Sequence, residues 1–405
     1  MVNIAVLGYG TVGSGVVEVM GTNQESINQK AGTEINIKYV LDLKDFPGDP
    51  VQDKIVHDID VILQDDSVGV VVEVMGGIEP AYTFVKKALE AGKSVVTSNK
   101  ALVAKHGAEL LKIAREANLN FLFEASVGGG IPIIRPLNLS LTSDEIVEIS
   151  GILNGTTNYI LTKMDKEGLA FDAVLKDAQE KGYAERNPEA DVEGYDSCRK
   201  IAILSSLAYG NQVDFEDIHC EGITKISEMD FKYASALGKS IKLIGRSTQE
   251  NGKVSAIVAP YMIDASHVFY AVNDVINGIN IKGNMVGDLT FVGAGAGKRP
   301  TASAVVTDVV DCAKNPGVNI MGGWNPEKLE LVPFEEMEAV FYVRVKGSVE
   351  EKLRDVENAL GKVASVVTLD GVSEEFAVVT APLKEGFFEK KSRTLDRVIN
   401  SIRIW

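Results

Sequence analysis

The segment 182–200 holds the densest group of side chains that could do chemistry, a carboxylate-rich loop that runs into an expected helix at 194–209. Asp196 and Lys200 lie four residues apart, which places them on one face of a helix and lets the carboxylate orient the ammonium group. A positioned amine can take up and return a proton as a general base and acid. The same spacing also occurs in exposed ion pairs worth only about 0.3–0.5 kcal/mol, and spacing alone favours that simpler interpretation.

A second lysine follows an expected strand. Thr97-Ser98-Asn99-Lys100 ends the apolar run 93–97, and residues 70–77 end the preceding run in the same way. Open α/β sheets bind their ligands at the carboxyl ends of their strands, so Lys100 is a candidate for contact with a ligand. A lysine at a strand end is more often a solvated cap, and its position leaves both interpretations open.

The first glycine-rich turn is the clearest binding motif. Gly8, Gly10 and Gly13 have the G-x-G-x-x-G spacing, directly after the apolar run 2–7 and at the start of an expected helix. The first glycine permits a tight turn, the second lets the main chain approach a pyrophosphate, and the third allows close packing of helix on strand. The amino end of the helix then faces the phosphates with unpaired N–H groups. We therefore expect this turn to bind NAD or NADP.

The choice between the two cofactors falls on the end of the second apolar run, 35–41. Asp42 could accept hydrogen bonds from the ribose hydroxyls of NAD, although it lies further along the chain than the usual distance of about 20 residues. Lys44 could instead favour the 2′-phosphate of NADP, and Asp42 is also a common residue for a plain turn. The preference stays open. The other expected contacts with the dinucleotide are Thr11, Val12, Ser98 and Lys100.

The elements that must position these residues form three segments. In 1–130, short apolar runs alternate with helical patterns, which predicts a Rossmann-type doubly wound parallel sheet of the α/β class. The glycine-rich passage 124–132 marks a junction, and residues 131–294 read as a mixed α+β domain. The runs in the first segment are 2–7, 35–41, 69–74, 93–97 and 119–123; in the second we expect strands near 145–152 and 253–263 and helices near 170–182, 194–209 and 230–239.

The tail, 335–405, reads as a separable domain. Its pattern is strand, helix, two strands, helix and strand, the βαββαβ order of a ferredoxin-like fold. The expected bounds are 339–346, 349–360, 362–369, 374–381, 386–398 and 399–405.

Composition limits the class of protein. A chain of 405 residues exceeds the usual size of one core, and a net charge of −16 argues against a nucleic-acid partner. The odd, widely spaced cysteines Cys198, Cys220 and Cys312 indicate neither a disulfide framework nor a zinc site. The first residues form an apolar strand without a basic leader and are too few to span a membrane. We expect a cytoplasmic protein without membrane contact.

With these residues in view, the chain closely resembles homoserine dehydrogenase over most of its length. The resemblance rests on the nucleotide turn, on Thr97-Ser98-Asn99-Lys100, on 124–131, on 154–159 and above all on 182–200. It implies the NAD(P)-dependent interconversion of L-homoserine and L-aspartate 4-semialdehyde, a step shared by threonine, methionine and isoleucine biosynthesis.

The same resemblance implies roles for individual residues. Lys200 would be the acid–base group, with Lys100 beside it near the nicotinamide and the substrate oxygen, and Asp196 would orient Lys200. Glu185, Asp191 and Asp196 would bind the small-molecule substrate through its ammonium group. A structural monovalent cation such as sodium would take oxygens, mainly main-chain ones, from Glu124, Val127, Gly129 and Ile131.

Two further segments acquire meaning from the family. Gly297 would contact the cofactor, and residues 295–320 would return to the nucleotide-binding domain. The tail resembles an ACT domain, the small regulatory module that binds amino-acid effectors, although Lys346-Gly347-Ser348-Val349 replaces the usual Asp-x-x-Gly ligand loop. The sequence therefore leaves threonine inhibition open, and the tail sheet is expected to contribute to a homodimer or homotetramer.

Two alternatives remain at this stage. The chain could be a non-catalytic dinucleotide-sensing regulatory protein, against which the set Glu185, Asp196 and Lys200 argues. It could also be a dehydrogenase of another amino acid. Aldehyde oxidation through a thioester is disfavoured because no cysteine lies in a recognisable nucleophile setting.

Overall fold

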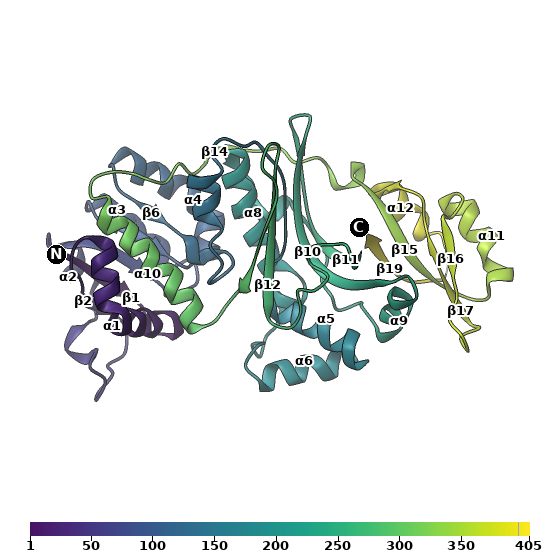
Figure 1. Cartoon of the computed structure of the whole chain (residues 1–405), viewed down its shortest axis with the longest axis horizontal. Coiled ribbons are helices and arrows are strands. Elements are labelled where there is room, and N and C mark those ends of the chain that lie inside the picture. Colours follow the sequence, from purple (N-terminus) through teal and green to yellow (C-terminus); the bar gives the residue numbers. More distant parts are fainter. Residues whose placement is uncertain (396) are drawn as a thin grey trace.

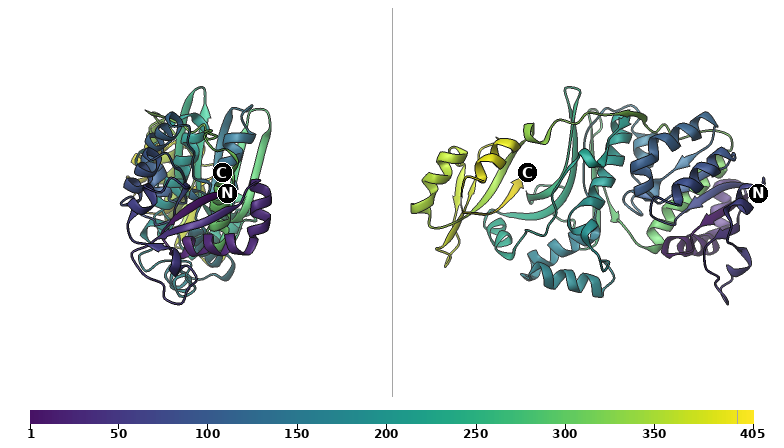
Figure 2. Two further views of the ribbon diagram at one scale, coloured as in Figure 1. Left: turned by 90° about the vertical axis from the view of Figure 1, so that its left-hand side faces the viewer. Right: turned by 180° about the vertical axis from the view of Figure 1, so that it is seen from behind.

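The computed structural model describes residues 1–395 and 397–405. The molecule is elongated: an α/β unit with the N-terminus lies at one end, a mixed sheet occupies the middle, and most of the segment after residue 338 lies at the other end (Figures 1 and 2). Among the residues described, no helix combines the length and the apolar character needed to cross a membrane.

The first sheet is parallel and has the strand order β3-β2-β1-β4-β5-β6. This is the order of doubly wound dinucleotide-binding folds, so the predicted Rossmann-type sheet is confirmed. Strands β1 and β4 are almost wholly buried, which is why they read as nearly continuous apolar runs. The strands are β1 (Val2–Leu7), β2 (Ile35–Leu41), β3 (Ile55–Val56), β4 (Val68–Glu73), β5 (Ser94–Thr97) and β6 (Phe121–Leu122).

Helices cover this sheet, and one of them comes from far along the chain. Helix α10 packs against α1, so closely that a Cβ on Gly15 would lie 2.8 Å from the carbonyl oxygen of Lys298. Figure 1 shows α10, in green, beside the purple α1. The helices are α1 (Thr11–Ala31), α2 (Ile59–Leu63), α3 (Ala81–Glu90), α4 (Lys100–Glu116) and α10 (Lys298–Lys314).

The middle of the molecule is a mixed sheet with helices on one face. Strand order begins β13-β12-β7-β10-β11, and α5, α8 and α9 contact these strands. The strands are β7 (Ile146–Ile152), β9 (His219–Cys220), β10 (Lys239–Glu250), β11 (Lys253–Asp264), β12 (Ile276–Gly283) and β13 (Gly287–Ala294); the helices are α5 (Gly155–Glu167), α6 (Phe171–Glu180), α7 (Glu189–Val192), α8 (Tyr195–Tyr209) and α9 (Glu228–Ala236). A small parallel pair joins β8 (Asn211–Gln212) to β14 (Asn325–Lys328).

Strand β10 differs from the sequence prediction. The expected helix at 230–239 ends at Ala236, and the chain turns at once into β10, which pairs with β11 along its whole length. Asn251 and Gly252 form the two-residue turn between them, with φ of 52° and 77°. An Asn-Gly pair suits such a turn because both central residues need positive φ.

The tail has the predicted βαββαβ order. Its strands are antiparallel neighbours in the order β19-β15-β17-β16, which is the ferredoxin-like arrangement. The expected helix at 386–398 ends at Ser392, because Val398 already belongs to the last strand; Asp396 lies outside the described residues. The elements are β15 (Glu338–Lys346), α11 (Val349–Leu360), β16 (Ser365–Val367), β17 (Glu375–Val379), β18 (Leu383–Lys384), α12 (Glu385–Ser392) and β19 (Val398–Ile404).

The tail is nevertheless continuous with the middle sheet. Strand β19 pairs in parallel with β11, with Arg403 opposite Tyr261 and Ile404 opposite Met262. The guanidinium of Arg403, which is buried, also binds Glu221 and Glu385. The prediction of a separable segment missed this connection, because the sequence of a strand does not show which other strand it pairs with.

Candidate active site

Helix α8 carries the pair predicted from its spacing. Asp196 lies in its first turn and Lys200 one turn later, and both point into the molecule, with only 3% and 8% of their surfaces exposed. Lys200 Nζ donates to Asp196 Oδ2 and to the carbonyl oxygen of Leu153, each at 2.7 Å. The pair is therefore not the exposed helix pair that the spacing alone favours.

Lys100 reaches the same carboxylate from the other domain. It is the first residue of α4, directly after β5, and its Nζ lies 2.5 Å from Asp196 Oδ1. Its side chain is 43% exposed, whereas Asp196 is buried. One carboxylate thus joins two ammonium groups, and the less buried one stands on the side open to a ligand.

Asn154 completes this group, which we call the Lys–Asp cluster: Lys100, Asn154, Asp191, Asp196 and Lys200. Its Nδ2 donates to Asp196 Oδ2 at 2.9 Å and to Asp191 Oδ1 at 2.7 Å. Its Oδ1 accepts from the main-chain N–H of Thr157 and so caps α5. The amide therefore fixes the two carboxylates relative to the end of a helix.

Burial and charge act together on the pKa values in the cluster. Burial alone would raise the pKa of Asp196, but the neighbouring Lys200 and Lys100 ammonium groups hold it well below its usual range. Burial lowers the pKa of Lys200, and Asp196 opposes that shift. Burial raises the pKa of Asp191, which the nearby Asp196 charge reinforces. Lys200 is thus a buried amine whose proton is easier to remove than that of an ordinary lysine.

Glu185, the other predicted substrate ligand, is not hydrogen-bonded to the cluster. It is exposed in the loop before α7, where its main-chain oxygen accepts a hydrogen bond from Gln179 Nε2 at 3.1 Å. None of the hydrogen bonds or ion pairs among the described residues involves its carboxylate. The structure thus brings Lys100, Asp191, Asp196 and Lys200 together, whereas the exposed Glu185 carboxylate makes no hydrogen bond or ion pair with them.

The glycine-rich turn opens on a cavity of about 440 Å³ at the carboxyl ends of β1, β2 and β4. The cavity is lined by Gly8, Gly10, Leu41, Asp42, Leu43, His57, Val74, Met75, Gly76, Pro80 and Phe84. A Cβ on Gly10 would meet no atom within 4 Å, whereas one on Gly13 would lie 1.9 Å from the carbonyl oxygen of Gly8. Gly13 is therefore needed for packing, and the open side of Gly10 is free for a ligand.

Asp42 lines this cavity, and its carboxylate already accepts hydrogen bonds from two main-chain N–H groups. Its Oδ2 accepts from the N–H of Tyr9 at 2.8 Å, and its Oδ1 accepts from the N–H of Lys44 at 3.0 Å. Thr11 and Val12 begin α1 beside the cavity, and Ser98 follows β5 with its N–H on the Glu73 carbonyl. Gly297 is the residue before α10, with φ of 115°.

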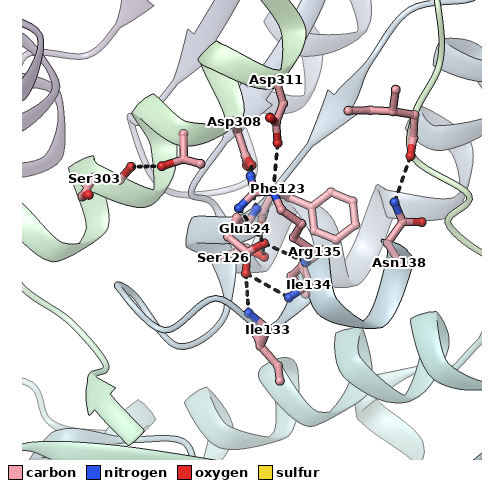
Figure 3. Close-up of polar contacts among 12 residues, drawn as sticks. Phe123, Glu124, Ser126, Ile133, Ile134, Arg135, Asn138, Ser303, Asp308 and Asp311 are labelled. Atoms are coloured by element: carbon pink, nitrogen blue, oxygen red, sulfur yellow. Dashed lines mark hydrogen bonds and ion pairs between the residues drawn. The ribbon is translucent and has the colours of Figure 1, made fainter. Parts of the chain in front are cut away.

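The segment predicted to bind a cation contains a buried carboxylate that the main chain uses. Glu124 accepts hydrogen bonds from the N–H groups of Ile133 and Ile134 on Oε1, at 2.5 and 2.9 Å, and of Arg135 on Oε2 at 2.7 Å. Figure 3 shows this fan of contacts. The carboxylate therefore holds the start of the next helical turn. Of the predicted cation ligands, the main-chain oxygens of Val127, Gly129 and Ile131 accept no hydrogen bond from a described residue, whereas that of Glu124 accepts from the N–H of Val127 at 3.5 Å.

The same region ties α10 to the junction. Asp308 accepts from the main-chain N–H of Glu124 at 2.8 Å and pairs with Arg135 at 2.7 Å, and Arg135 also binds Asp311 at 2.8 Å (Figure 3). Burial and the neighbouring Glu124 charge raise the pKa of Asp308 to about 8, and the Arg135 guanidinium only partly opposes that rise.

Comparison with known proteins shows the family to which this chain belongs. Residues 132–310 match the family model described as homoserine dehydrogenase, and residues 8–124 match its NAD-binding domain. A homoserine dehydrogenase of Helicobacter pylori is 42% identical over 373 residues, covering 92% of this chain and 86% of that one. The chain belongs to the homoserine dehydrogenase family. It is accordingly an oxidoreductase, with a domain for NAD(P).

Other homoserine dehydrogenases agree in sequence and in fold. That of Bacillus subtilis is 38% identical over 391 residues, covering 95% of this chain and 88% of its own. A solved structure from Thiobacillus denitrificans has a TM-score of 0.93 and 33% identity, covering 100% of this chain and 98% of that one. A hyperthermophilic archaeal mutant enzyme, solved with NADPH, has a TM-score of 0.66 and 29% identity and covers 77% of this chain and 97% of its own.

Two buried residues of this homoserine dehydrogenase site were not singled out from the sequence. Asn154 lay within a family motif, and its position before a helical pattern was the available signal, since asparagine is a common helix cap. Glu73 ends β4, where its Oε1 accepts from the N–H of Met75 at 2.8 Å and its Oε2 from Thr97 Oγ1 at 2.5 Å. A carboxylate that ends an apolar strand is the corresponding signal for Glu73.

Proposed function

We propose that the Lys–Asp cluster performs the proton transfer in the NAD(P)-dependent interconversion of L-homoserine and L-aspartate 4-semialdehyde. The observation that carries this proposal is the buried Lys200 amine, held by Asp196 and by the Leu153 carbonyl at 2.7 Å each. The geometry supplies an oriented base whose pKa burial lowers. By its family the step serves threonine, methionine and isoleucine biosynthesis.

In the direction of oxidation, the hydroxyl proton of homoserine passes to the unprotonated Nζ of Lys200 as the C–O bond becomes the aldehyde C=O. The bound nicotinamide supplies the hydride acceptor for the hydrogen that leaves the same carbon. Lys100, whose ammonium group stays partly exposed beside Asp196, steadies the substrate oxygen. In the reverse direction Lys200 returns the proton as a general acid.

Carboxylates hold the amino group of the substrate. Within the cluster, Asp191 comes from the short helix α7 and Asp196 from the first turn of α8, and Asn154 donates a hydrogen bond to each. Glu185 approaches from the exposed loop and completes the set when substrate binds. An ammonium group among such carboxylates gains charge-assisted hydrogen bonds, which favour an amino-acid substrate over a simple alcohol.

The cofactor lies in the 440 Å³ cavity at the glycine-rich turn. Gly8, Gly10, Thr11, Val12 and Gly13 face its phosphates, Asp42 its ribose, and Ser98, Lys100 and Gly297 the end nearer the chemistry. The choice of NAD or NADP rests with Asp42, whose oxygens bind two main-chain N–H groups, and with the neighbouring side chain of Lys44. The hydrogen bond from Tyr9 leaves Asp42 with acceptor capacity for a ribose hydroxyl.

A monovalent cation such as sodium fits the junction only through the main chain. The Glu124 carboxylate is committed to N–H groups. The carbonyl oxygens of Val127, Gly129 and Ile131 accept no hydrogen bond from any described residue. Together with the Glu124 carbonyl they would hold such an ion, which would steady the junction between the domains without taking part in the chemistry.

The domain plan follows from the same family. Residues 1–130 with 295–320 bind the nucleotide, 131–294 bind substrate and mediate a homodimer or homotetramer, and 335–405 form an ACT-like regulatory domain in which 346–349 replaces the usual ligand loop. The ferredoxin-like strand order of the tail supports the last assignment. We place the enzyme in the cytoplasm.

The test is a substrate comparison. Purified protein is mixed with NAD⁺ or NADP⁺ and either L-homoserine or L-aspartate, and nicotinamide reduction is followed. Reduction with homoserine alone supports the proposal, and the ratio of the two cofactors gives the preference. Equal reduction with another amino acid, or none with homoserine and either cofactor, overturns it. Repeating the assay with sodium and with threonine tests the cation and the effector.

A further inference from the structure

Asn277 is a polar residue in an apolar row. On β12 it shares a face with Ile279 and Ile281, the face that the helices cover, and 0% of its surface is exposed. Among the described residues, neither Nδ2 nor Oδ1 of its side chain has a hydrogen-bond partner. Buried amides are almost always paired, because an unpaired one loses its hydration without compensation.

The amide lies between two glycines. A Cβ on Gly295 would lie 1.9 Å from Asn277 Nδ2, and a Cβ on Gly155 would lie 3.5 Å from Asn277 Oδ1. Gly155 is the first residue of α5, next to Asn154 of the Lys–Asp cluster. Gly295 and the two residues after it connect β13 to α10. The chain approaches the amide so closely on the Gly295 side that no side chain fits there.

The Asn277 amide lies where the chain passes from the middle sheet to the nucleotide-binding unit. The 295–297 segment leads from the middle sheet to α10, which packs on the nucleotide-binding unit. On its other side it meets Gly129, whose Cβ would lie 2.6 Å from the carbonyl of Gly295. Strand β12 pairs with β7 as far as Gly278 opposite Ile152, so Asn277 lies beside Leu153, whose oxygen holds Lys200.

We infer that Asn277 is a positioning residue whose amide hydrogen-bonds to the main chain of the 295–297 segment when cofactor and substrate are bound, and so sets Gly297 against the cofactor. The inference rests on the proposed function. A buried amide normally has a hydrogen-bond partner, and the main chain of the 295–297 segment lies directly against Asn277 at Gly295. The 295–297 segment packs against the amide at Gly295 and ends at Gly297, the expected cofactor contact.

The test uses Asn277→Leu, which has nearly the same shape and continues the row of Ile279 and Ile281. Replacing an unpaired buried polar group by an apolar one of similar shape is neutral or stabilising. We therefore expect the melting temperature of the ligand-free variant to be equal to or above that of wild type. We expect kcat to fall by about tenfold or more, as for loss of an interaction made in the reacting complex. The further rise in melting temperature given by NADP⁺ with L-homoserine should be smaller than in wild type.

Asn280→Leu is the matched control. Asn280 is also a buried asparagine of β12, but it lies on the opposite face and is paired, donating to Asp288 at 3.0 Å and accepting from Thr290 at 2.7 Å. Its loss should lower the ligand-free melting temperature and leave kcat near wild type. Asn277→Ala, which adds no bulk, replaces the leucine variant if that one does not fold.

The outcomes separate the inference from the function. If Asn277 variants keep wild-type kcat and the full ligand-dependent rise in melting temperature, the inference is overturned. It is also overturned if they melt lower without ligand and the ligand-dependent rise is unchanged, which is the behaviour of a packing residue. Wild type without homoserine oxidation would overturn the proposed function instead, and NADPH binding measured by fluorescence would still compare the variants.

Discussion

Two neighbours hold the amine of Lys200 in place. Its Nζ lies 2.7 Å from Asp196 Oδ2 and 2.7 Å from the Leu153 carbonyl, in a place from which water is largely excluded. Burial lowers the pKa of the amine, while Asp196 keeps it oriented. The spacing of the pair could be predicted from the sequence, but its burial could not, because Leu153 and Asn154, which follow β7, come from another part of the chain.

Removing the amine is the first test at this scale. Lys200→Ala should retain cofactor binding, since Lys200 lies away from the glycine-rich turn, and should lose roughly 10²–10⁴ in kcat, the usual range for a general acid–base group. Steady-state kinetics with NADPH binding by fluorescence measures both. Lys112→Ala, which breaks an exposed pair with Glu116 on α4, is the control and should keep full activity. An unchanged kcat in Lys200→Ala would remove Lys200 from the mechanism.

At the scale of elements, the strand, turn and helix at the N-terminus were predictable because local sequence decides them. The apolar run forms β1, the glycines form the turn, and the helix begins at Thr11. Strand β10 was harder, since Lys239–Glu250 mixes charged and apolar residues and follows a helix directly. The Asn251-Gly252 turn was the usable signal. Elements that a local motif encodes could be predicted from the sequence. Elements that form only by pairing with a distant strand could not.

The glycines of the turn should separate binding from folding. A Cβ at Gly10 meets open space and its φ of −75° suits alanine, whereas a Cβ at Gly13 overlaps the Gly8 carbonyl. Gly10→Ala should therefore melt like wild type and bind NAD(P) more weakly. Gly13→Ala should melt at a lower temperature. Thermal melting and fluorescence titration check both, and equal melting temperatures for the two variants would contradict this division of roles.

At the scale of the whole molecule, the tail and the middle sheet form one structure. Strand β19 pairs with β11, and the buried Arg403 of β19 forms ion pairs with Glu221 and Glu385. Glu221 follows Cys220, whose thiol donates to the Glu193 carbonyl just before α8. Each domain's internal order could be predicted from its own periodicity. The joints between domains could not, because they depend on single buried charges and on which strand edges meet.

Arg403 is therefore expected to stabilise more than the tail. Arg403→Met leaves the buried Glu385 carboxylate without its partner, which costs about 3–5 kcal/mol in comparable buried pairs. The variant should unfold at a clearly lower temperature than wild type in a scanning calorimeter. Arg393→Met, which removes an exposed partner of Glu389, should melt like wild type. If Arg403→Met also melts like wild type, the joint contributes nothing to stability.

The central claim, that a buried Lys200 amine takes the proton of the substrate, is tested most directly by the pH dependence of homoserine oxidation. Oxidation needs the unprotonated amine, so kcat should rise as the pH increases and Lys200 loses its proton. The midpoint of this rise should lie below pH 10.5, the ordinary pKa of a lysine. The Lys100 charge helps to lower the pKa of Lys200, so removing that charge in Lys100→Met should shift the midpoint of the rise in kcat to higher pH. The measurement is kcat against pH for both proteins, with deuterated homoserine used to establish that the chemical step is measured. If the midpoint of the rise in kcat is unchanged in Lys100→Met, or lies at lower pH, Lys200 is not the group that takes the proton.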